Sequence, residues 1–415
     1  MGRAGDETIS LRSLTPSIFL PTVVFDIGNG AVAPILALTA LDLGASPAQA
    51  GVVVALLGLG QLAGNVPAAA LVNRVGDRRA MIISACLAGI GMVASYAATH
   101  VVALGLATLV VGACNATFNL ARHTYVTVAV PTSMRAAVMS TVGGSHRIGM
   151  LIGPFLGAAV IHATHQRAAF LVAVGAVVAT VLVLVAVPEP AHAAALSQRP
   201  RETASALTVW REHARLLLTL GAAIFAVGAV RAARSTVVPL WADHIGLDAQ
   251  TTSVIFGIGA AVDVALFYPS GRLMDRYGRL FVAVPSMLLL GGAMMLLPLT
   301  GGAASVIAVA LGMGLGNGIG SGIVLTLGAD VAPRDATVRF LSQWRLMGDS
   351  GIACGPLLVS AVAALGSLGA GIAAAGAIGV LAAAGVARWA PRYSPFATRE
   401  MAAARRGSTV IHPGQ

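Results

Sequence analysis

Charged side chains are scarce in this sequence, and lysine is absent altogether. Only 10% of the 415 residues are charged, whereas 57% are hydrophobic. The mean hydropathy of +0.85 lies outside the range of soluble domains. This composition excludes an ordinary soluble protein and predicts a chain whose solvent is the lipid bilayer.

Cysteine is also rare, which limits the chemistry that the chain can carry. The three cysteines (Cys86, Cys114, Cys354) lie inside apolar runs, without CxxC or histidine-ligand spacing. They are therefore expected to be small buried residues rather than metal ligands or disulfide partners. No nucleophile–base pair is evident, so we expect neither an enzyme nor a bound metal or cofactor. The first apolar run is too long for a cleavable signal peptide, and none is expected.

Twelve apolar runs are long enough to cross the ~30 Å hydrocarbon core of a bilayer. A polar stretch from 188 to 215 divides them into six and six. The runs cover about 17–40, 48–72, 80–98, 101–126, 136–160, 168–187, 216–241, 249–271, 280–299, 303–327, 339–364 and 367–387. The pattern predicts an all-α membrane protein with twelve transmembrane helices.

The two sets of six runs are copies of one unit. An offset of 202 residues brings Leu71, Arg74 and Gly76 of one loop into register with Leu273, Arg276 and Gly278 of another, and it also aligns glycines and prolines far from these loops. A parallel duplication of this kind builds the two halves of many transporters. We therefore expect two six-helix bundles related by a parallel repeat. The predicted domains are a first bundle at 1–187, a cytoplasmic linker at 188–215, a second bundle at 216–388 and a cytoplasmic tail at 389–415.

Arginine is distributed unequally between the two sides of the predicted helices. Most arginines lie at the termini, in the 188–215 linker and in alternate loops, whereas the opposite loops hold only Arg167. A basic excess beside apolar spans indicates cytoplasmic loops. The net charge of +10 is thus a topological signal, and no nucleic-acid partner is expected. We predict a multi-pass protein of the inner (plasma) membrane with both termini cytoplasmic, and with Ser46 and Asp248 as helix N-caps at the outer surface.

The residues Gly271-x-Leu273-x-Asp275-Arg276-x-Gly278-Arg279 resemble the loop signature of the major facilitator superfamily, between its eighth and ninth helices. The 73–79 loop is similar to its counterpart between helices two and three. The resemblance implies that Asp275 lies near a helix N-terminus of the opposite half and holds the outward-facing state closed on the cytoplasmic side. Because Asn73 replaces the acid in the first copy, the second copy should be the stronger latch. The gating residues implied are Asn73, Arg74, Gly76, Gly271, Asp275, Arg276, Gly278 and Arg279.

A second motif, Gly149-x-x-x-Gly153-Pro154-x-x-Gly157-Ala158, is similar to the glycine-proline motif of the twelve-span drug/proton antiporter branch of this superfamily. Its Gly-x-x-x-Gly-Pro part recurs in the eleventh span at Gly351, Gly355 and Pro356. Small residues allow close helix packing, and proline bends a helix. The resemblance implies interdomain packing by Arg147, Gly149, Gly153, Pro154, Gly157, Gly355 and Pro356. A third signature, an arginine in the fourth span, is missing because Thr108 stands there, so its proton-relay role is not carried over.

Ionisable residues inside membrane helices are costly and are functional candidates by default. The candidates are Asp26, Arg122, Arg147, Arg231, Arg234, Asp263, Arg345 and Asp349. Structural pairing is an equally open interpretation. From their depths we predict an Arg147–Asp263 ion pair between the halves and an Arg345–Asp349 pair one turn apart on one helix, with Gln61 as a further partner of Asp349. Asp26, Asp263 and Asp349 are the proton-coupling candidates, with Asp26 foremost because it lies ~14 Å into its helix.

In the family that the chain resembles, spans one, four, seven and ten line the central cavity. The predicted cavity residues are Asn29, Asn115, Asn119, Arg122, Arg231, Arg234, Asn317 and Ser321, together with Asp26. The arginine excess leans toward substrates with an acidic group. His123 and His146 could exchange protons near neutrality if they faced water, but packing or hydrogen bonding is the role we expect of both.

These patterns favour a secondary active transporter that exports small organic compounds, acidic or drug-like, in exchange for protons by alternating access. A proton symporter that imports a metabolite is the first alternative, because no residue fixes the direction. A non-transporting membrane sensor is a second alternative, although the chain has no sizeable soluble domain. The expected partners are a small-molecule substrate, protons and the lipid bilayer, and we expect a monomer.

Overall fold

The computed structural model describes residues 15–130, 134–187, 210–333 and 337–401. In these ranges the chain forms helices joined by short turns, with no strand. Twelve of the helical segments, between 20 and 31 residues long, are long and apolar enough to cross a membrane, which confirms the predicted number and fold class. Outside the described residues lie Arg3, Arg12, Arg334, most of the 188–215 linker and the tail after 401.

The first six spans and the last six spans are built from separate sets of helices. The first set comprises η1 (Thr15–Phe19), α1 (Leu20–Val32), α2 (Ile35–Asp42), α3 (Pro47–Val75), α4 (Asp77–Tyr96), α5 (Val101–Ala129), α6 (Arg135–Ala163), η2 (Gln166–Ala168) and α7 (Ala169–Ala186). The second set comprises α10 (Ala214–Leu216), η3 (Leu217–Gly221), α11 (Ala222–His244), α12 (Ala249–Tyr277), α13 (Arg279–Leu296), η4 (Leu297–Leu299), α14 (Ala303–Ile319), α15 (Ile323–Val331), α16 (Thr337–Leu365) and α17 (Leu368–Tyr393).

The 202-residue offset holds at the level of helix ends. Both bounds of α3 map onto those of α12, and both bounds of α6 map onto those of α16. The turns match too, since Gly76 and Gly278 both adopt positive φ, at 85° and 92°, which glycine tolerates without a Cβ clash. Two spans differ: α1 and α2 are separated where α11 is continuous, and α14 and α15 are separated where α5 is continuous.

The predicted N-caps are present at the start of α3 and α12. The Ser46 hydroxyl accepts from the Gln49 backbone N–H at 3.3 Å, and the Asp248 carboxylate accepts from the Thr251 backbone N–H at 2.6 Å. Each cap satisfies one of the helix-start donors that would otherwise lack a partner. The two caps are related by the repeat, so both spans start in the same way.

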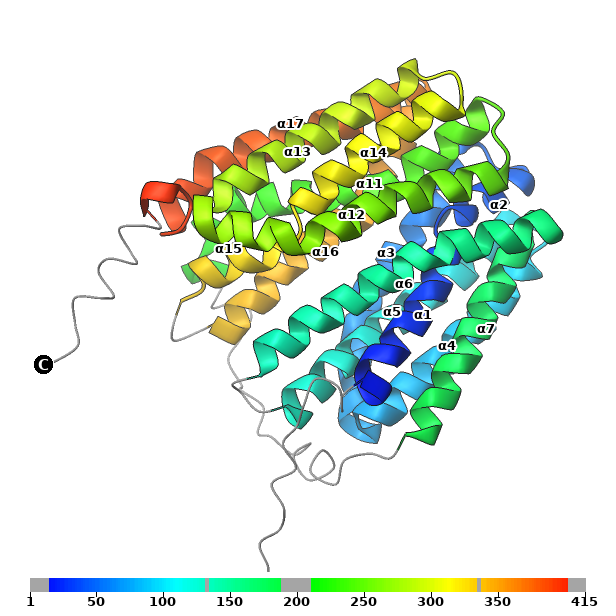
Figure 1. The fold of residues 1–415 in the computed structure, drawn as a ribbon, viewed down its shortest axis with the longest axis horizontal. Helices are drawn as coiled ribbons and strands as arrows, with labels where there is room; N and C mark the ends of the chain where they lie inside the picture. Colours follow the sequence, from blue (N-terminus) through cyan, green and yellow to red (C-terminus); the bar gives the residue numbers. More distant parts are fainter. Residues whose placement is uncertain (1–14, 131–133, 188–209, 334–336, 402–415) are drawn as a thin grey trace, which may run out of the picture.

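The two bundles meet along two helix pairs, α3 with α16 and α6 with α12. The second span thus packs on the eleventh, and the fifth packs on the eighth. Figure 1 shows the bundles close together at the end that holds α2 and diverging toward the end where α6 and α16 begin. We call these the closed end and the splayed end. At the closed end α2 also packs on α11, and His162 lies 3.0 Å from the Gln250 side-chain oxygen of α12.

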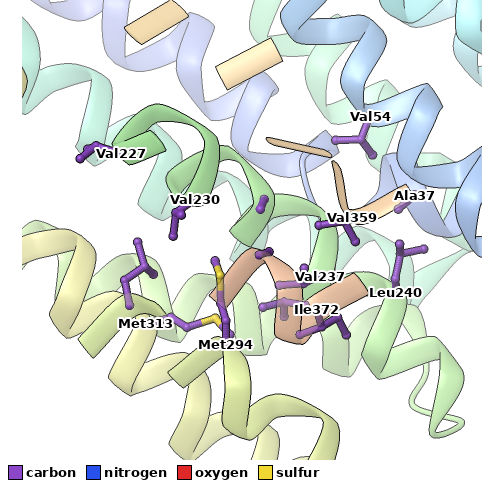
Figure 2. Packing of buried hydrophobic residues seen from close by; sticks show 14 of the residues in the cluster. Ala37, Val54, Val227, Val230, Val237, Leu240, Met294, Met313, Val359 and Ile372 are labelled. Atoms are coloured by element: carbon purple, nitrogen blue, oxygen red, sulfur yellow. The ribbon is translucent and has the colours of Figure 1, made fainter. Parts of the chain in front are cut away.

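Apolar packing continues from one bundle into the other at the closed end. One buried cluster includes Ala37 and Val54 from the first bundle together with Leu240 and Val359 from the second, and Figure 2 shows these side chains near one another. All four are less than 8% exposed. Because interiors are close-packed, this cluster seals the closed end.

The glycines that permit close contact between the bundles are not those of the antiporter-like motif. A Cβ on Gly58 of α3 would lie 2.9 Å from the Cα of Ala353 on α16. By contrast, a Cβ on Gly149 would lie 2.5 Å from the Val23 carbonyl oxygen on α1, within its own bundle, and Gly153 and Gly157 face α1 as well. Gly355 faces α11 in the same manner. The close approach that these motif glycines allow is therefore inside each bundle, not between the bundles as the motif predicted.

Candidate functional site

A cavity of about 230 Å³ is lined mostly by residues of the first bundle. The second bundle contributes Ser235 of α11 and Phe256 of α12 to its wall. The polar residues of the wall are Asp26, Asn29, Gln61, Ser95, Thr108, Asn115, Asn119, His146 and Ser235. The remaining wall is apolar. A mainly apolar hollow with a few convergent polar groups is the usual form of a small-molecule site.

Three of the polar lining groups form a chain of hydrogen bonds from α5 to α1. Asn115 donates through Nδ2 to Oδ1 of Asn29 at 3.3 Å, and Asn29 donates through Nδ2 to Oδ1 of Asp26 at 3.2 Å. Asp26 and Asn29 share one face of α1 because they are three residues apart. The chain orients all three side chains while they line the cavity.

Asp26 is the centre of a buried ion cluster at the wall of the cavity. Its Oδ2 lies 3.5 Å from Arg122 Nη1 and 2.9 Å from His146 Nδ1. The Asp26 and Arg122 side chains are each 5% exposed, whereas His146 is 47% exposed. Arg122 also donates to Oδ1 of Asn119 at 2.7 Å. The carboxylate is thus held by a buried guanidinium on one side and by an accessible imidazole on the other.

The contact of His146 with Asp26 was not predicted from the sequence. We expected this histidine to serve mainly in packing or hydrogen bonding. It lies three residues before Gly149, whose lack of a side chain brings α6 onto α1 at the level of Asp26. The glycine spacing on α6 is the one signal in the sequence that could have pointed to this approach.

A second ion cluster joins the two bundles. Arg147 of α6 donates to Oδ1 of Asp263 on α12, so the predicted pair between the halves is present. Asn317 of α14 donates to the other carboxylate oxygen at 2.5 Å, and Arg234 Nη1 of α11 lies 3.7 Å from that oxygen. Side-chain exposure is 20% or less for the three charged members. One carboxylate therefore receives donors from three other helices and from both bundles.

Arg231 and Ser321 occupy a polar seam of the second bundle beside this cluster. Arg231 donates to the carbonyl oxygen of Gly320, at the break between α14 and α15, and its Nε has no hydrogen-bond partner among the described residues. Ser321 donates to the Asn317 carbonyl oxygen at 3.3 Å. Of the predicted cavity residues, Asp26, Asn29, Asn115 and Asn119 line the 230 Å³ cavity, whereas Arg122, Arg231, Arg234, Asn317 and Ser321 are not part of its wall.

The third predicted acid, Asp349, pairs along its own helix. Arg345 Nε lies 3.5 Å from Asp349 Oδ2, one turn apart on α16. Their side chains are 56% and 32% exposed, so this pair is more accessible than the Asp26 and Asp263 clusters. The predicted Arg345–Asp349 pair is therefore present. Gln61, the further partner expected for Asp349, lies on α3 in the cavity wall.

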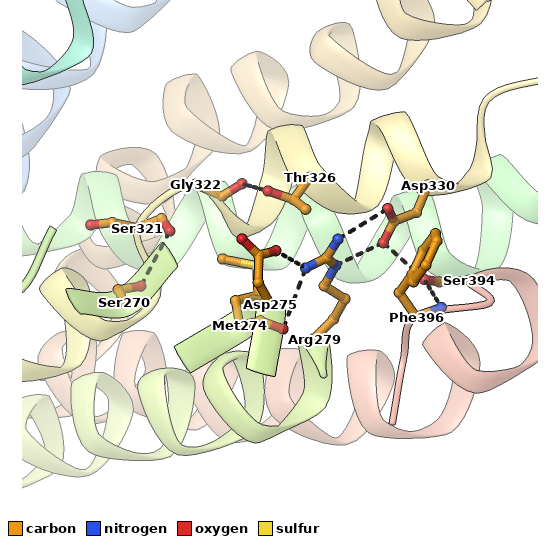
Figure 3. Close-up of polar contacts among 10 residues, drawn as sticks. All are labelled: Ser270, Met274, Asp275, Arg279, Ser321, Gly322, Thr326, Asp330, Ser394 and Phe396. Atoms are coloured by element: carbon orange, nitrogen blue, oxygen red, sulfur yellow. Dashed lines mark hydrogen bonds and ion pairs between the residues drawn. The ribbon is translucent and has the colours of Figure 1, made fainter. Parts of the chain in front are cut away.

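The signature loop is organised around Arg279, the first residue of α13 (Figure 3). Arg279 donates through Nη1 to Asp275 at 2.8 Å and through Nε to Asp330 of α15 at 2.9 Å. Arg279 is 9% exposed, whereas the Asp275 side chain is 77% exposed. One partner of the loop acid thus belongs to its own bundle. In the first copy of the loop, Asn73 and Arg74 are exposed, and the nearby Arg78 donates to the Leu184 carbonyl oxygen at the end of α7.

Residues 394–397, directly after α17, pack against the start of α13. The backbone N–H groups of Arg279 and Leu280 donate to the carbonyl oxygens of Phe396 and Ala397, at 3.1 and 3.0 Å. Ser394 donates to Asp330 at 3.0 Å (Figure 3). The first N–H groups of a helix lack partners inside it. Here they are satisfied by a segment more than 110 residues later, which we call the C-terminal cap segment.

Metal-binding chemistry finds no support in the described ranges. There, no group of three or more histidine, cysteine or acidic residues could hold a metal ion.

Cys114 is buried and Cys354 is half-buried, but Cys86 is exposed on α4, so the expectation that all three cysteines are buried is wrong for Cys86. Its neighbours on this face include exposed apolar residues such as Leu87 and Ile90, as expected where a helix faces lipid.

Comparisons with known proteins agree with this architecture. The family model described as Major Facilitator Superfamily matches residues 18–356. A solved POT family transporter in complex with 5-aminolevulinic acid is similar in fold, with a TM-score of 0.70 at 14% identity, covering 92% of this chain and 96% of that one. A POT family transporter in complex with a thioalcohol-conjugated peptide gives a TM-score of 0.70 at 15% identity, with the same coverage. A search of curated proteins found no match.

Proposed function

This chain belongs to the Major Facilitator Superfamily and is a multi-pass membrane transporter rather than an enzyme, and from that premise we propose that it exports small organic compounds in exchange for protons. The observation that carries the proposal is the cavity wall at Asp26. There a buried carboxylate, an accessible histidine and a chain of amides meet at a hollow of about 230 Å³. The proton and the substrate would thus bind at the same wall of the cavity.

Alternating access is supported by the way the bundles meet. Their contacts follow two helix pairs related by the repeat, and they are reinforced by α2 at the closed end. With both termini in the cytoplasm, as the arginine distribution favours, the splayed end faces the cytoplasm and the structure is an inward-facing state. The proposal takes 1–187 and 216–388 as the two moving bodies of a monomer in the inner (plasma) membrane, joined by the 188–215 linker and followed by a tail at 389–415.

An acidic group on the substrate is supported by the excess of arginine over acid among the ionisable residues inside the membrane helices. Arg122, Arg147, Arg231, Arg234 and Arg345 outnumber Asp26, Asp263 and Asp349. Arg231 retains a buried Nε without a hydrogen-bond partner among the described residues. Uncompensated guanidinium groups recognise carboxylates and phosphates. We therefore favour small organic acids, and drug-like compounds carrying an acidic group, as substrates.

The deciding experiment uses purified protein in liposomes with an imposed proton gradient. A panel of neutral, cationic and anionic organic compounds is added, and dissipation of the gradient is followed with an internal pH dye. We expect gradient dissipation with anionic compounds and none in liposomes without protein. If no compound in any charge class dissipates the gradient, while labelled compounds still exchange across the membrane, the protein is a transporter that is not coupled to protons.

The direction of coupling follows from how protons and substrate affect each other's binding. Exchange requires that bound protons weaken substrate binding, whereas import by symport requires that they strengthen it. Because linkage is reciprocal, measuring substrate affinity at several pH values decides between the two. Affinity that falls as the pH is lowered supports export, and affinity that rises supports a symporter. The likeness of the Gly149–Ala158 motif to the antiporter branch favours the first outcome.

A further inference from the structure

His146 is the most accessible ionisable group on the cavity wall. Its side chain is 47% exposed, while the Asp26 side chain that it contacts is 5% exposed. His146 is a wall residue of the cavity. A proton that arrives from the cavity therefore meets the imidazole before it can meet the carboxylate.

Both oxygens of Asp26 lie close to donor groups, although only Oδ1 accepts a hydrogen bond from the described residues. Oδ1 accepts from Asn29, and Oδ2 faces both Arg122 Nη1 at 3.5 Å and His146 Nδ1 at 2.9 Å. For Asp26 to take a proton alone, one of these contacts would have to give way. The ring can bind a proton on its cavity side, because a histidine has two nitrogens and only Nδ1 is directed at Asp26.

We infer that His146 and Asp26 form a single proton-binding unit, in which His146 exchanges protons with the cavity and Asp26 holds the ring in place. The inference rests on the proposed proton coupling and deepens it, because it names the site. Histidine is the side chain whose charge changes most readily near neutral pH. When the ring is protonated, its contact with Asp26 becomes an ion pair.

Charged groups surround this unit on several helices. They are Asp26 on α1, Arg122 and His123 on α5, Arg147 on α6 itself, Asp263 on α12, and Arg345 and Asp349 on α16. The helix α7, which also packs on α6, carries no ionisable residue between Ala169 and Ala186. Counted with Arg234, which also contacts Asp263, four arginines face three aspartates, so a proton on His146 adds to an existing excess of positive charge.

The position of His146 in α6 connects this proton to the contact between the bundles. Successive residues in an α-helix point about 100° apart. His146 accordingly faces Asp26 in its own bundle, while Arg147 faces Asp263 in the other bundle. The charge on His146 changes next to the residue that bridges the bundles. Proton binding thus acts on the seam along which the bundles move.

The test observes the proton directly and does not depend on transport. Full-length protein carrying ¹⁵N-labelled histidine is reconstituted in nanodiscs, and ring nitrogen signals are recorded from about pH 5 to 8, the range in which histidine changes charge. The His146 signal is identified by its loss in His146→Gln. We expect this signal to titrate within the range and its titration to move in Asp26→Asn. A His146 signal that does not change across the range overturns the inference.

A transport measurement on the same variants separates this inference from the proposed function. Glutamine can still donate to Asp26 but cannot carry a proton, so His146→Gln should lower proton-driven transport much more than it lowers substrate exchange. It should reduce gradient-driven transport at least tenfold and flatten the pH profile of exchange. His100→Gln, an exposed histidine next to Thr99, is the matched control and should behave as wild type. Undiminished gradient-driven transport by His146→Gln refutes the inference, while wild type that exchanges substrate without moving protons refutes the proposed coupling.

Discussion

Arg147 of α6 and Asp263 of α12 form an ion pair that crosses the seam between the two bundles. The equivalent places at the other seam hold Asp349 and Gln61, and these two cannot form the same ion pair because Gln61 is uncharged. The duplicated positions have diverged, so only one of the two equivalent seams carries this pair. The two seams therefore differ in how strongly electrostatics holds them together.

The Arg147–Asp263 pair is expected to be a conformational latch. Either single change, Arg147→Asp or Asp263→Arg, leaves charges of like sign at a largely buried site and should lower transport at least tenfold. The charge-swapped double variant should recover part of the lost activity. Recovery is incomplete because the new arginine at 263 lies beside Arg234. Substrate exchange in liposomes measures all three variants, and a double variant no more active than either single variant would count against the latch.

Asp26→Asn is expected to uncouple transport from the proton gradient. The substitution keeps the shape of the side chain but removes the negative charge that faces Arg122 and His146. Gradient-driven transport should fall at least tenfold, while substrate binding or exchange stays measurable. Asp42→Asn, at the closed end where Asp42 accepts from Gln166, serves as the control. Unchanged uphill transport by Asp26→Asn would remove Asp26 from the coupling mechanism.

The two copies of the signature loop are expected to contribute unequally to gating. Asp275 carries a full negative charge and accepts from Arg279 at 2.8 Å, whereas the first copy has a neutral Asn73. Asp275→Asn should therefore shift the population toward inward-facing states more than Asn73→Ala does. Distances between spin labels on the splayed ends of α6 and α12 report this shift. Equal changes in the two variants would show that the loops are equivalent.

A single added methyl group should disturb the seam between α3 and α16. In Gly58→Ala the new Cβ would lie 2.9 Å from the Cα of Ala353, so the helices must separate. We expect a lower fraction of the closed-end conformation and slower exchange. Gly175→Ala on α7 is the matched control, since a Cβ there has no atom within 4 Å. The gain in helix propensity from glycine to alanine, about 1 kcal/mol at most, is the same in both variants. Thermal unfolding and exchange rates of the two variants should differ clearly, and matching values would mean that the seam tolerates the separation.

The large features of this fold could be predicted because they depend on properties that lie along the chain. The apolar runs predicted the membrane spans, and the 202-residue offset predicted the repeat. The depths of Arg147 and Asp263 along their helices predicted the ion pair between them. The contact of His146 with Asp26 could not be predicted, since it depends on how α6 is rotated about its axis against α1. For the same reason the motif glycines could not be assigned to a partner helix, because a small residue permits close approach without saying to what.

The residues that contact the signature loop in the folded protein could not be predicted from the sequence either. Asp330 lies 51 residues from Arg279 in a short helix after a break, and no spacing rule connects the two. The break itself falls at Gly320–Gly322, where Gly322 has a φ of 81°. A glycine-rich span predicts such flexibility in general but not its place. Packing against α12, α13 and α16 decides where the helix gives way.

The C-terminal cap segment places the end of the folded protein beyond its last membrane span. A gene shortened to stop at Tyr393 would encode every transmembrane helix, yet it would deprive Arg279 and Leu280 of the carbonyl oxygens that accept their N–H groups, and Asp330 of its bond from Ser394. Such a truncated product should reach the membrane with a displaced signature loop. A purification tag should therefore be attached after Met401, where it leaves these contacts in place.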